Sequence, residues 1–344
     1  IFTQALNLVL IYLFLTLGYG IAGLLWATII PAAVSLAVLY YASADNLKYP
    51  SSPQDRGEPL DMKPVRSYSY TMWSQNLIGY LLGKQTDITL MGLFKTSLAS
   101  VGCYNIAFEL TNKIGFFLTG AGLLTLSSIS EKYTASGKEG LRSIWTHLFK
   151  IFALATFPIM FFTAANCKGI ITALYTAEMA ESIPMFYLFV AVMAITTMIG
   201  AGLSRMCLYV LQMQKTYLKI AAFSGILNLL LDLALIPRMG AFGAVLATTA
   251  STLTGNILTG IIFWRTVGFS YPAGFILRLV PGLALAVSPT MLIETDRLRF
   301  LALEGILFFL CTIVIFRFLK LFSDQEKTRI AEINPMLGKV VSFF

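Results

Sequence analysis

The sequence is poor in charged residues. Only 12% of its 344 residues are Asp, Glu, Lys or Arg, whereas 57% are hydrophobic. Soluble domains are about one quarter charged, so this chain has too few charges to cover a water-exposed surface of its size. Its mean hydropathy of +0.76 points the same way. We therefore expect lipid, not water, to surround much of the chain.

The residues that usually carry catalysis and metal binding are also scarce. The single histidine, His147, leaves little material for a catalytic triad or a histidine-based metal site. The four cysteines form no C-x-x-C pair and lie in or beside apolar runs, as small buried hydrophobic residues do. No P-loop is present, so direct use of ATP is not expected. We predict no catalytic residues, no metal and no cofactor, and hence no enzyme.

Long apolar runs dominate what is there. A membrane-spanning helix needs about 20 mostly apolar residues, and strand-type alternation is missing. The sequence predicts an all-α, polytopic membrane protein with ten spans, at 3–17, 20–42, 70–94, 100–126, 145–165, 184–211, 217–236, 240–264, 273–293 and 298–320.

The basic residues indicate how these spans are oriented. The net charge is +8, but the basic residues lie in short segments between apolar runs and not on a soluble module, so nucleic-acid binding is not expected. If the spans alternate, 18 of the 25 basic residues fall in one set of connections, and only five fall in the other. This asymmetry follows the positive-inside rule and places the first set, with both chain ends, in the cytoplasm.

Two polar segments interrupt the apolar pattern. Residues 43–69 combine several prolines with charges, which favours a linker over a span. Residues 130–143 carry five charged side chains and predict a solvated cytoplasmic turn or a short amphipathic helix.

Two segments of the chain resemble each other. Residues 7–28 and 228–248 align with one gap, and both read as a helix, a tight turn with glycine, and a helix that opens G-x-x-G. The shared positions are Asn7 with Asn228, Gly20 with Gly240, Gly23 with Gly243, Ala27 with Ala247 and Thr28 with Thr248. Small residues there let two helices approach closely. Both copies run in the same sense, as in transporters built from parallel repeats.

The repeat also predicts a domain organisation. Its second copy forms the fifth and sixth helices of a lobe that begins near Tyr70, so an equivalent first lobe would need about four helices before Ile1. We therefore expect an N-terminally truncated chain with about ten of fourteen spans. The predicted parts are the last two helices of an N-terminal lobe (1–42), a cytoplasmic linker (43–69), a six-helix C-terminal lobe (70–267), two additional helices (268–322) and a cytoplasmic tail (323–344).

Several segments carry a family resemblance over nearly the whole chain. QTDITLMGLF (85–94), SSISEKYTASGKEGLRSI (127–144) and ILNLLLDLALIPRMGAFGAVLATTAS (226–251) resemble, in this order and spacing, the Wzx-type polysaccharide or O-antigen flippases. These belong to the multidrug/oligosaccharidyl-lipid/polysaccharide superfamily and have MATE-like two-lobe bundles. The chain departs from the family pattern at 17–19, where Leu-Gly-Tyr replaces Ile-Pro, and at Asp232, where an uncharged residue is commoner.

The resemblance implies a function and a location. The cargo would be an undecaprenyl-pyrophosphate-linked oligosaccharide, a repeat unit of O-antigen, capsule or exopolysaccharide. It would cross the bacterial inner membrane by alternating access through a central cavity, without covalent chemistry. The implied partners are membrane lipids, a polysaccharide polymerase and glycosyltransferases.

Ionisable side chains inside spans are costly and usually face a cavity or a partner. Lys84 and Asp87 lie three residues apart in one predicted span, and Glu109 and Lys113 lie four apart in the next. Each pair either neutralises itself to permit insertion or lines a wet cavity that binds pyrophosphate or sugar. Asn105 is a further cavity candidate, with helix–helix hydrogen bonding as the alternative.

Two more ionisable residues stand apart from these pairs. Arg205 is a substrate-cavity candidate because a guanidinium matches phosphate oxygens, and an interfacial anchor is the alternative. Asp232 lies alone within its predicted span and is a candidate for proton or cation coupling, with a hydrogen bond to a neighbouring helix as the alternative.

Other functions fit the same architecture. A MATE-type drug/cation antiporter should have a mainly acidic cavity, whereas the spans here contain three basic residues (Lys84, Lys113, Arg205) and three acidic ones (Asp87, Glu109, Asp232). This balance favours an anionic cargo. A flippase for the peptidoglycan lipid precursor stays open, as does a membrane scaffold that transports nothing.

Overall fold

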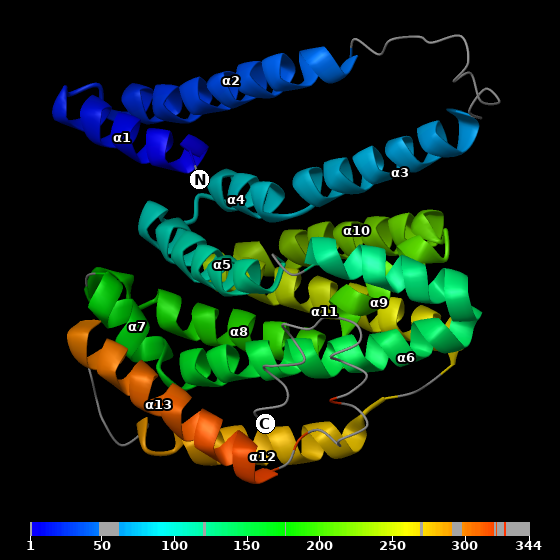
Figure 1. Cartoon of the computed structure of the whole chain (residues 1–344). Coiled ribbons are helices and arrows are strands. Elements are labelled where there is room, and N and C mark those ends of the chain that lie inside the picture. Colours follow the sequence, from blue (N-terminus) through cyan, green and yellow to red (C-terminus); the bar gives the residue numbers. More distant parts are fainter. Residues whose placement is uncertain are drawn as a thin grey trace. The chain divides into compact units, whose positions relative to one another are not determined.

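The computed structural model describes residues 2–47, 62–119, 122–175, 177–268, 271–290 and 298–319, together with Leu321 and Lys327 (Figure 1). The regular elements in these ranges are helices. The chain divides into two compact units, Ile1–Pro64 and Val65–Phe344. Most of the predicted linker and nearly all of the predicted tail lie outside the described residues.

The first unit is a helical hairpin. It contains α1 (Phe2–Thr16) and α2 (Gly20–Leu47), which pack against each other. The side chain of Asn7 on α1 donates a hydrogen bond of 3.1 Å to the carbonyl oxygen of Ala27 on α2. Because the acceptor is a backbone carbonyl of α2, this hydrogen bond fixes the position of α1 along α2.

The second unit contains eleven α-helices in the described residues, the first of which, α3 (Met62–Leu81), begins before its boundary. The others are α4 (Lys84–Leu93), α5 (Leu98–Thr119), α6 (Gly122–Ala165), α7 (Cys167–Leu174), α8 (Ser182–Ile199), α9 (Ala201–Val210), α10 (Gln214–Met239), α11 (Ala241–Val267), α12 (Ala273–Val287) and α13 (Leu298–Leu319). A short 3-10 turn, η2 (Ala177–Met179), follows α7.

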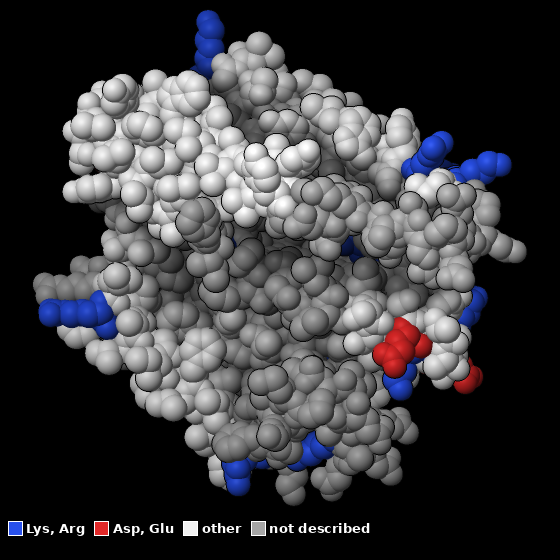
Figure 2. Space-filling view, turned by 45° about the horizontal axis from the view of Figure 1, so that its top comes forward, with Lys and Arg blue, Asp and Glu red and all other residues white. Residues whose placement is uncertain are grey.

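The helices are those of a multi-pass membrane protein. In the described residues, six helices are long and apolar enough to cross a bilayer, namely α2, α6, α8, α10, α11 and α13. The helices α1 and α12 are also apolar but shorter. Large apolar side chains are exposed along their outer faces, as Leu303, Ile306 and Leu310 are on α13. In the space-filling view, few side chains among the described residues on this face are charged (Figure 2). Such a surface is suited to lipid.

Two of the predicted spans are broken in the structure. The span predicted at 70–94 is interrupted at Leu82–Gly83, between α3 and α4, and α4 then packs against α10 and α11. The span predicted at 184–211 is interrupted at Gly200, whose φ of +69° is left-handed. A Cβ at Gly200 would stand 2.6 Å from the Trp145 ring. Only glycine combines this backbone conformation with such close packing.

The region between the predicted spans 100–126 and 145–165 also differs from the simplest expectation. The polar segment 130–143 is helical and belongs to α6, which bends at Gly137 (φ +58°, ψ −142°) and is thus two helices joined by a kink. This agrees with the amphipathic-helix alternative. The short helix α7 and the turn η2 were not predicted, because eight residues are too few to give a clear periodic signal.

The two turns of the predicted repeat have the same backbone features. Gly20, the first residue of α2, and Gly240, which precedes α11, have φ angles of +52° and +57°. A Cβ at Gly23 would lie 2.7 Å from a side chain of α1, and one at Gly243 would lie 2.5 Å from a carbonyl oxygen of α10. Glycine at both positions therefore permits the tight return of the chain in each copy.

Two buried clusters hold the second unit together. One centres on Trp145, which stacks on Phe149 (ring centroids 5.2 Å apart) and packs against Phe263 of α11. The other surrounds Tyr104 of α5, whose ring packs edge-on against Phe189 of α8. These clusters fix α5, α8 and α11 around the polar residues described next.

Candidate functional site

A network of buried polar side chains joins α4, α5, α10 and α11. Asp87 of α4 is fully buried and accepts hydrogen bonds from three residues. The donors are the Tyr104 hydroxyl, the Asn228 amide at 2.9 Å and the Thr248 hydroxyl at 2.7 Å. Because a buried carboxylate is costly to leave unsatisfied, these contacts explain how Asp87 is accommodated at the centre of the unit.

The same network contains a second buried acid. The Asn228 amide also donates to Asp232 Oδ2 at 2.8 Å, so one side chain bridges two carboxyl groups. Ser251 donates to Asn228 Oδ1 at 3.0 Å and fixes the orientation of the amide. Asp232 Oδ1 is buried without a partner in the described part of the chain. Two adjacent buried carboxylates repel each other unless a proton or a cation lies between them, so the pair is suited to ion coupling.

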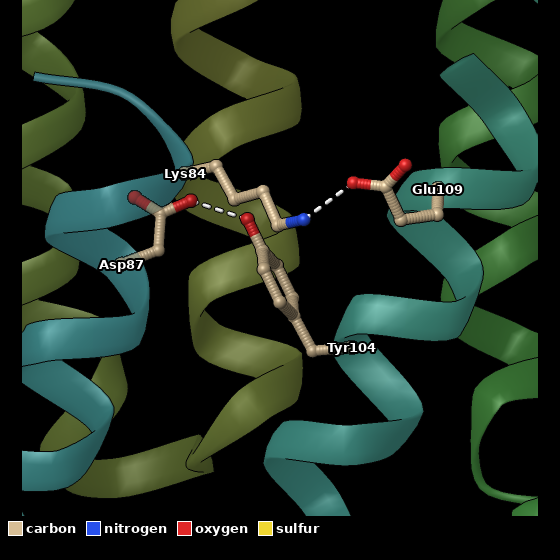
Figure 3. Close-up of polar contacts among 4 residues, drawn as sticks. All are labelled: Lys84, Asp87, Tyr104 and Glu109. Atoms are coloured by element: carbon tan, nitrogen blue, oxygen red, sulfur yellow. Dashed lines mark hydrogen bonds and ion pairs between the residues drawn. The ribbon is translucent and has the colours of Figure 1, made fainter. Parts of the chain in front are cut away.

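The structure corrects the pairing expected for Asp232 and Asp87. Asp232 does not lie alone within its span, since Asn228, four residues away on α10, links it to Asp87 on α4. Asp87 and Lys84 do not neutralise each other. They lie near the start of α4 and point in different directions, Asp87 to Tyr104 and Lys84 to Glu109 (Figure 3).

Lys84 and Glu109 form an ion pair between α4 and α5. Lys84 Nζ lies 2.5 Å from Glu109 Oε1 and 5.1 Å from the centroid of the Phe108 ring (Figure 3). Half of the Glu109 side chain is exposed. An exposed ion pair of this kind stabilises the fold by at most about 1 kcal/mol. The expected pairing of Glu109 with Lys113 within one helix is therefore replaced by a contact between α4 and α5.

The remaining two candidates on α5 are not joined to this network. Lys113 is exposed, and no ion pair or hydrogen bond connects it to another described residue. Asn105 is half-buried, and its side-chain oxygen has no hydrogen-bond partner in the described part of the chain.

A polar cavity of about 480 Å³ lies beside the buried network. Asn228, Thr248 and Ser251 of the network belong to its wall. The other polar groups in the wall are the side chains of Gln75, Asn76, Arg205, Tyr209, Tyr217, Ser224, Thr252, Asn256 and Thr259. Of the described residues that line it, one is basic and none is acidic. The cavity therefore offers amides, hydroxyls and one positive charge, which suit a polar or anionic ligand.

Arg205 contributes that charge from α9. Its Nη1 donates to the Tyr217 hydroxyl at 3.4 Å, and its guanidinium lies 5.8 Å from the centroid of the Tyr217 ring. Tyr209 in turn donates to Gln75 at 2.8 Å. These contacts hold α3, α9 and α10 around the cavity and place Arg205 in its wall.

Sequence reasoning missed several members of the buried network. Tyr104 and Ser251 carried no signal, because single hydroxyl residues in apolar helices are common. Asn228 and Thr248 did carry one, since both are shared positions of the internal repeat. A polar residue that is present in both copies of an apolar segment indicates a buried hydrogen bond as well as a repeated architecture.

Comparisons with known proteins agree with this architecture. Residues 1–184 match a family described as polysaccharide biosynthesis protein. Among solved structures, the chain is similar to the lipid II flippase MurJ in an inward closed conformation, with a TM-score of 0.64 and 15% sequence identity, over 92% of this chain and 67% of that one. No curated protein sequence matches significantly. The chain thus shares its fold with MurJ, and it belongs to the family of polysaccharide biosynthesis proteins.

Proposed function

We propose that the chain is part of a flippase that moves an undecaprenyl-pyrophosphate-linked oligosaccharide across the bacterial inner membrane by alternating access. The observation that carries this proposal is the polar cavity inside an otherwise apolar helical unit, with Arg205 as the one charged residue among the described residues that line it. Sugar hydroxyls suit the amides and hydroxyls of the wall, and a phosphate suits the guanidinium. Membership of the polysaccharide biosynthesis family supports a glycan cargo.

The energy for transport would come through the buried acid pair. In this proposal, Asp87 and Asp232 exchange a proton or bind a monovalent cation, and Asn228 keeps the two carboxyl groups together. Because the pair contacts α4, α5, α10 and α11, a change in its charge alters how these helices pack. Lys84, Glu109, Lys113 and Asn105 remain proposed cavity residues on the two helices that carry Asp87 and its partner Tyr104.

A second candidate function is the flipping of the peptidoglycan lipid precursor. The likeness to the lipid II flippase MurJ favours it, because that protein has the same fold. The two cargoes share a lipid pyrophosphate and differ in the glycan. A drug/cation antiporter fits less well, since no acidic side chain lines the described part of the cavity.

The test uses the complete gene in the source cell or in a strain that lacks its own flippase. Deletion should abolish surface polysaccharide and leave peptidoglycan synthesis intact, and Asp87→Asn or Asp232→Asn should reduce export at unchanged membrane levels of the protein. Glu139→Gln is a matched acid-to-amide control, because Glu139 is exposed and lies outside both the cavity and the acid network. Loss of peptidoglycan synthesis would favour the second function. Unchanged surface polysaccharide with greater sensitivity to cationic dyes would overturn the proposal in favour of an antiporter.

A further inference from the structure

Another cavity, of about 270 Å³, lies between α5, α8 and α11, and we call it the threonine pocket. The lining residues of α5 and of α8 are three or four positions apart, so on each helix they share one face. The polar part of the lining consists of five threonines and one amide, namely Thr111, Thr196, Thr248, Thr249, Thr252 and Asn112. None of the described residues that line the pocket is charged. The pocket therefore suits an uncharged polar ligand.

The threonine hydroxyls present acceptor oxygens. Thr111, Thr196 and Thr249 donate their hydroxyl protons to carbonyl oxygens of their own helices, at 2.8, 3.0 and 2.7 Å. A hydroxyl oxygen has two lone pairs, so each of these oxygens can still accept a hydrogen bond. Asn112 and Thr252 are exposed, and their side chains form no hydrogen bond with another described residue. The pocket thus offers acceptors for several hydroxyl groups, together with the amide protons of Asn112 as donors.

Two phenylalanine rings belong to the apolar part of the wall. Phe108 of α5 and Phe189 of α8 meet edge to face, with ring centroids 5.6 Å apart and an interplanar angle of 83°. A sugar ring carries hydroxyls around its edge and C–H groups on its faces, so it needs hydrogen-bonding groups and aromatic surface in the same pocket. An ion would find no opposite charge among the described lining residues, and a hydrocarbon chain would leave the Asn112 amide without a partner. The lining therefore matches a sugar better than either.

Gly115 keeps space open in the pocket. It belongs to the lining on α5, and no described atom lies within 4 Å of the position that its Cβ would take. Its φ is not positive, so the backbone does not require glycine here, although glycine costs a helix about 1 kcal/mol relative to alanine. A larger side chain at this position would occupy the pocket. Gly115 therefore leaves room for a ligand and gives a direct way to close the site.

We propose that the threonine pocket binds one uncharged sugar unit. The sugar hydroxyls would donate to the threonine oxygens, the C–H groups would pack against the phenylalanine rings, and the Asn112 amide would bind a sugar oxygen. Thr248 and Thr252 line both this pocket and the larger polar cavity, so the two adjoin along α11. The step that makes this sugar part of the lipid-linked cargo rests on the proposed function, whereas sugar binding itself does not.

The same sugar chemistry could come from two sources. One is a soluble glycoside, and the other is the headgroup of a glycolipid, of which the lipid-linked cargo would be a special case. Because the site is defined by sugar binding, it can be tested without any transport assay.

The experiment measures sugar binding to the purified full chain in phosphatidylcholine nanodiscs, because a glycoside detergent would compete for the pocket. In the first arm, the methyl glycosides of glucose, galactose, mannose and N-acetylglucosamine are titrated and followed by saturation-transfer-difference NMR, and glucuronic acid is the charged comparison. In the second arm, thermal stability is compared in nanodiscs with and without monoglucosyl diacylglycerol.

The variants close the pocket or remove its amide. Gly115→Leu should abolish binding without lowering the stability of the sugar-free protein, because the new side chain enters open space and leucine favours helix. Asn112→Leu should weaken binding about tenfold through the loss of one or two hydrogen bonds. Gly102→Leu is the matched control and should bind like the wild type, since Gly102 lies on the same helix, also has open space at its Cβ position and does not line the pocket. Glucuronic acid should bind more weakly than the neutral glycosides, because its carboxylate would be buried without an opposite charge.

The two arms separate the sources of the sugar. Binding of a methyl glycoside that Gly115→Leu abolishes supports a soluble sugar, and stabilisation only by the glycolipid that Gly115→Leu abolishes supports a headgroup. If Gly115→Leu lowers the stability of the protein, Asn112→Leu decides in its place. Binding in neither arm, binding that both variants leave unchanged, or equal binding of glucuronic acid overturns the inference.

The outcome is independent of the proposed function. If sugar binding is confirmed while deletion of the gene leaves surface polysaccharide unchanged, the sugar site stands and the proposed cargo does not. If deletion abolishes surface polysaccharide while no sugar binds in either arm, the proposed cargo stands and the sugar site does not.

Discussion

The amide of Asn228 offers the sharpest test of the buried network. It donates to Asp87 Oδ1 at 2.9 Å and to Asp232 Oδ2 at 2.8 Å, and it accepts a hydrogen bond from Ser251 at 3.0 Å. Asn228→Ala removes all three bonds at a site that is only 3% exposed. The two acids, which lie next to each other, would then lose the donor they share.

The expected loss of stability follows from the two bonds to carboxyl groups. Because two adjacent buried acids are stable when one is protonated, one bond is to a charged group, at about 1.5–3 kcal/mol, and the other is to a neutral one, at about 1 kcal/mol. Losing both costs about 2.5–4 kcal/mol of the free energy of unfolding. The neutral bond to Ser251 adds about 1 kcal/mol, and water that enters the space would return part of the total. We expect a net loss of at least about 3 kcal/mol.

The assay is denaturant unfolding of the purified protein in detergent, followed by tryptophan fluorescence. Asn256→Ala is the matched control, because Asn256 is half-buried and its side chain forms no hydrogen bond with another described residue. It should change the free energy of unfolding by no more than about 0.5 kcal/mol. A double-mutant cycle with Asp87→Asn should give a coupling energy of about 0.5–3 kcal/mol. A loss below about 1 kcal/mol for Asn228→Ala, or no coupling, would refute the reasoning.

Three other outcomes are expected. Gly200→Ala should cost about 2–5 kcal/mol, because its Cβ would stand 2.6 Å from Trp145 in a left-handed conformation, whereas Gly202→Ala, with open space around it, should be neutral in the same unfolding assay. Burial raises the pKa of Tyr271, which lies between α11 and α12, to about 12. Because an unfolded tyrosine loses its proton near pH 10, before the folded one does, the free energy of unfolding should fall as pH rises above about 10. The fall should be less steep in Tyr271→Phe. A tag inserted near Pro53 or after Lys320 should be labelled only from the cytoplasmic side. Labelling from the periplasmic side would contradict the predicted topology.

Much of the architecture could be predicted from the sequence. Three described helices, α10, α11 and α13, begin and end within a few residues of a predicted span. This agreement has a simple reason, because in lipid every backbone polar group must be satisfied within the helix and the apolar length of a segment decides whether it spans. The division into a linker, lobes and a tail remains a prediction.

The helix breaks could not be predicted in the same way. The run 184–211 is apolar throughout, and nothing in it shows that the chain turns at Gly200. The turn depends on Trp145, 55 residues earlier, which occupies the place of a Cβ. The N-terminus of α9 exists only because of this break.

The same distinction applies to the candidate site, where the sequence identified residues and the structure showed their contacts. The sequence alone determined that lipid surrounds the chain, and that any charged side chain within a span must have a function or a partner, because burying a charge in hydrocarbon is costly wherever it occurs. It therefore identified Lys84, Asp87, Glu109, Arg205 and Asp232 one by one. Only the tertiary structure decided their partners. Lys84 turns from its neighbour Asp87 to Glu109, and Asn228 joins two acids 145 residues apart, because hydrogen bonds depend on distances in space that helical spacing does not contain.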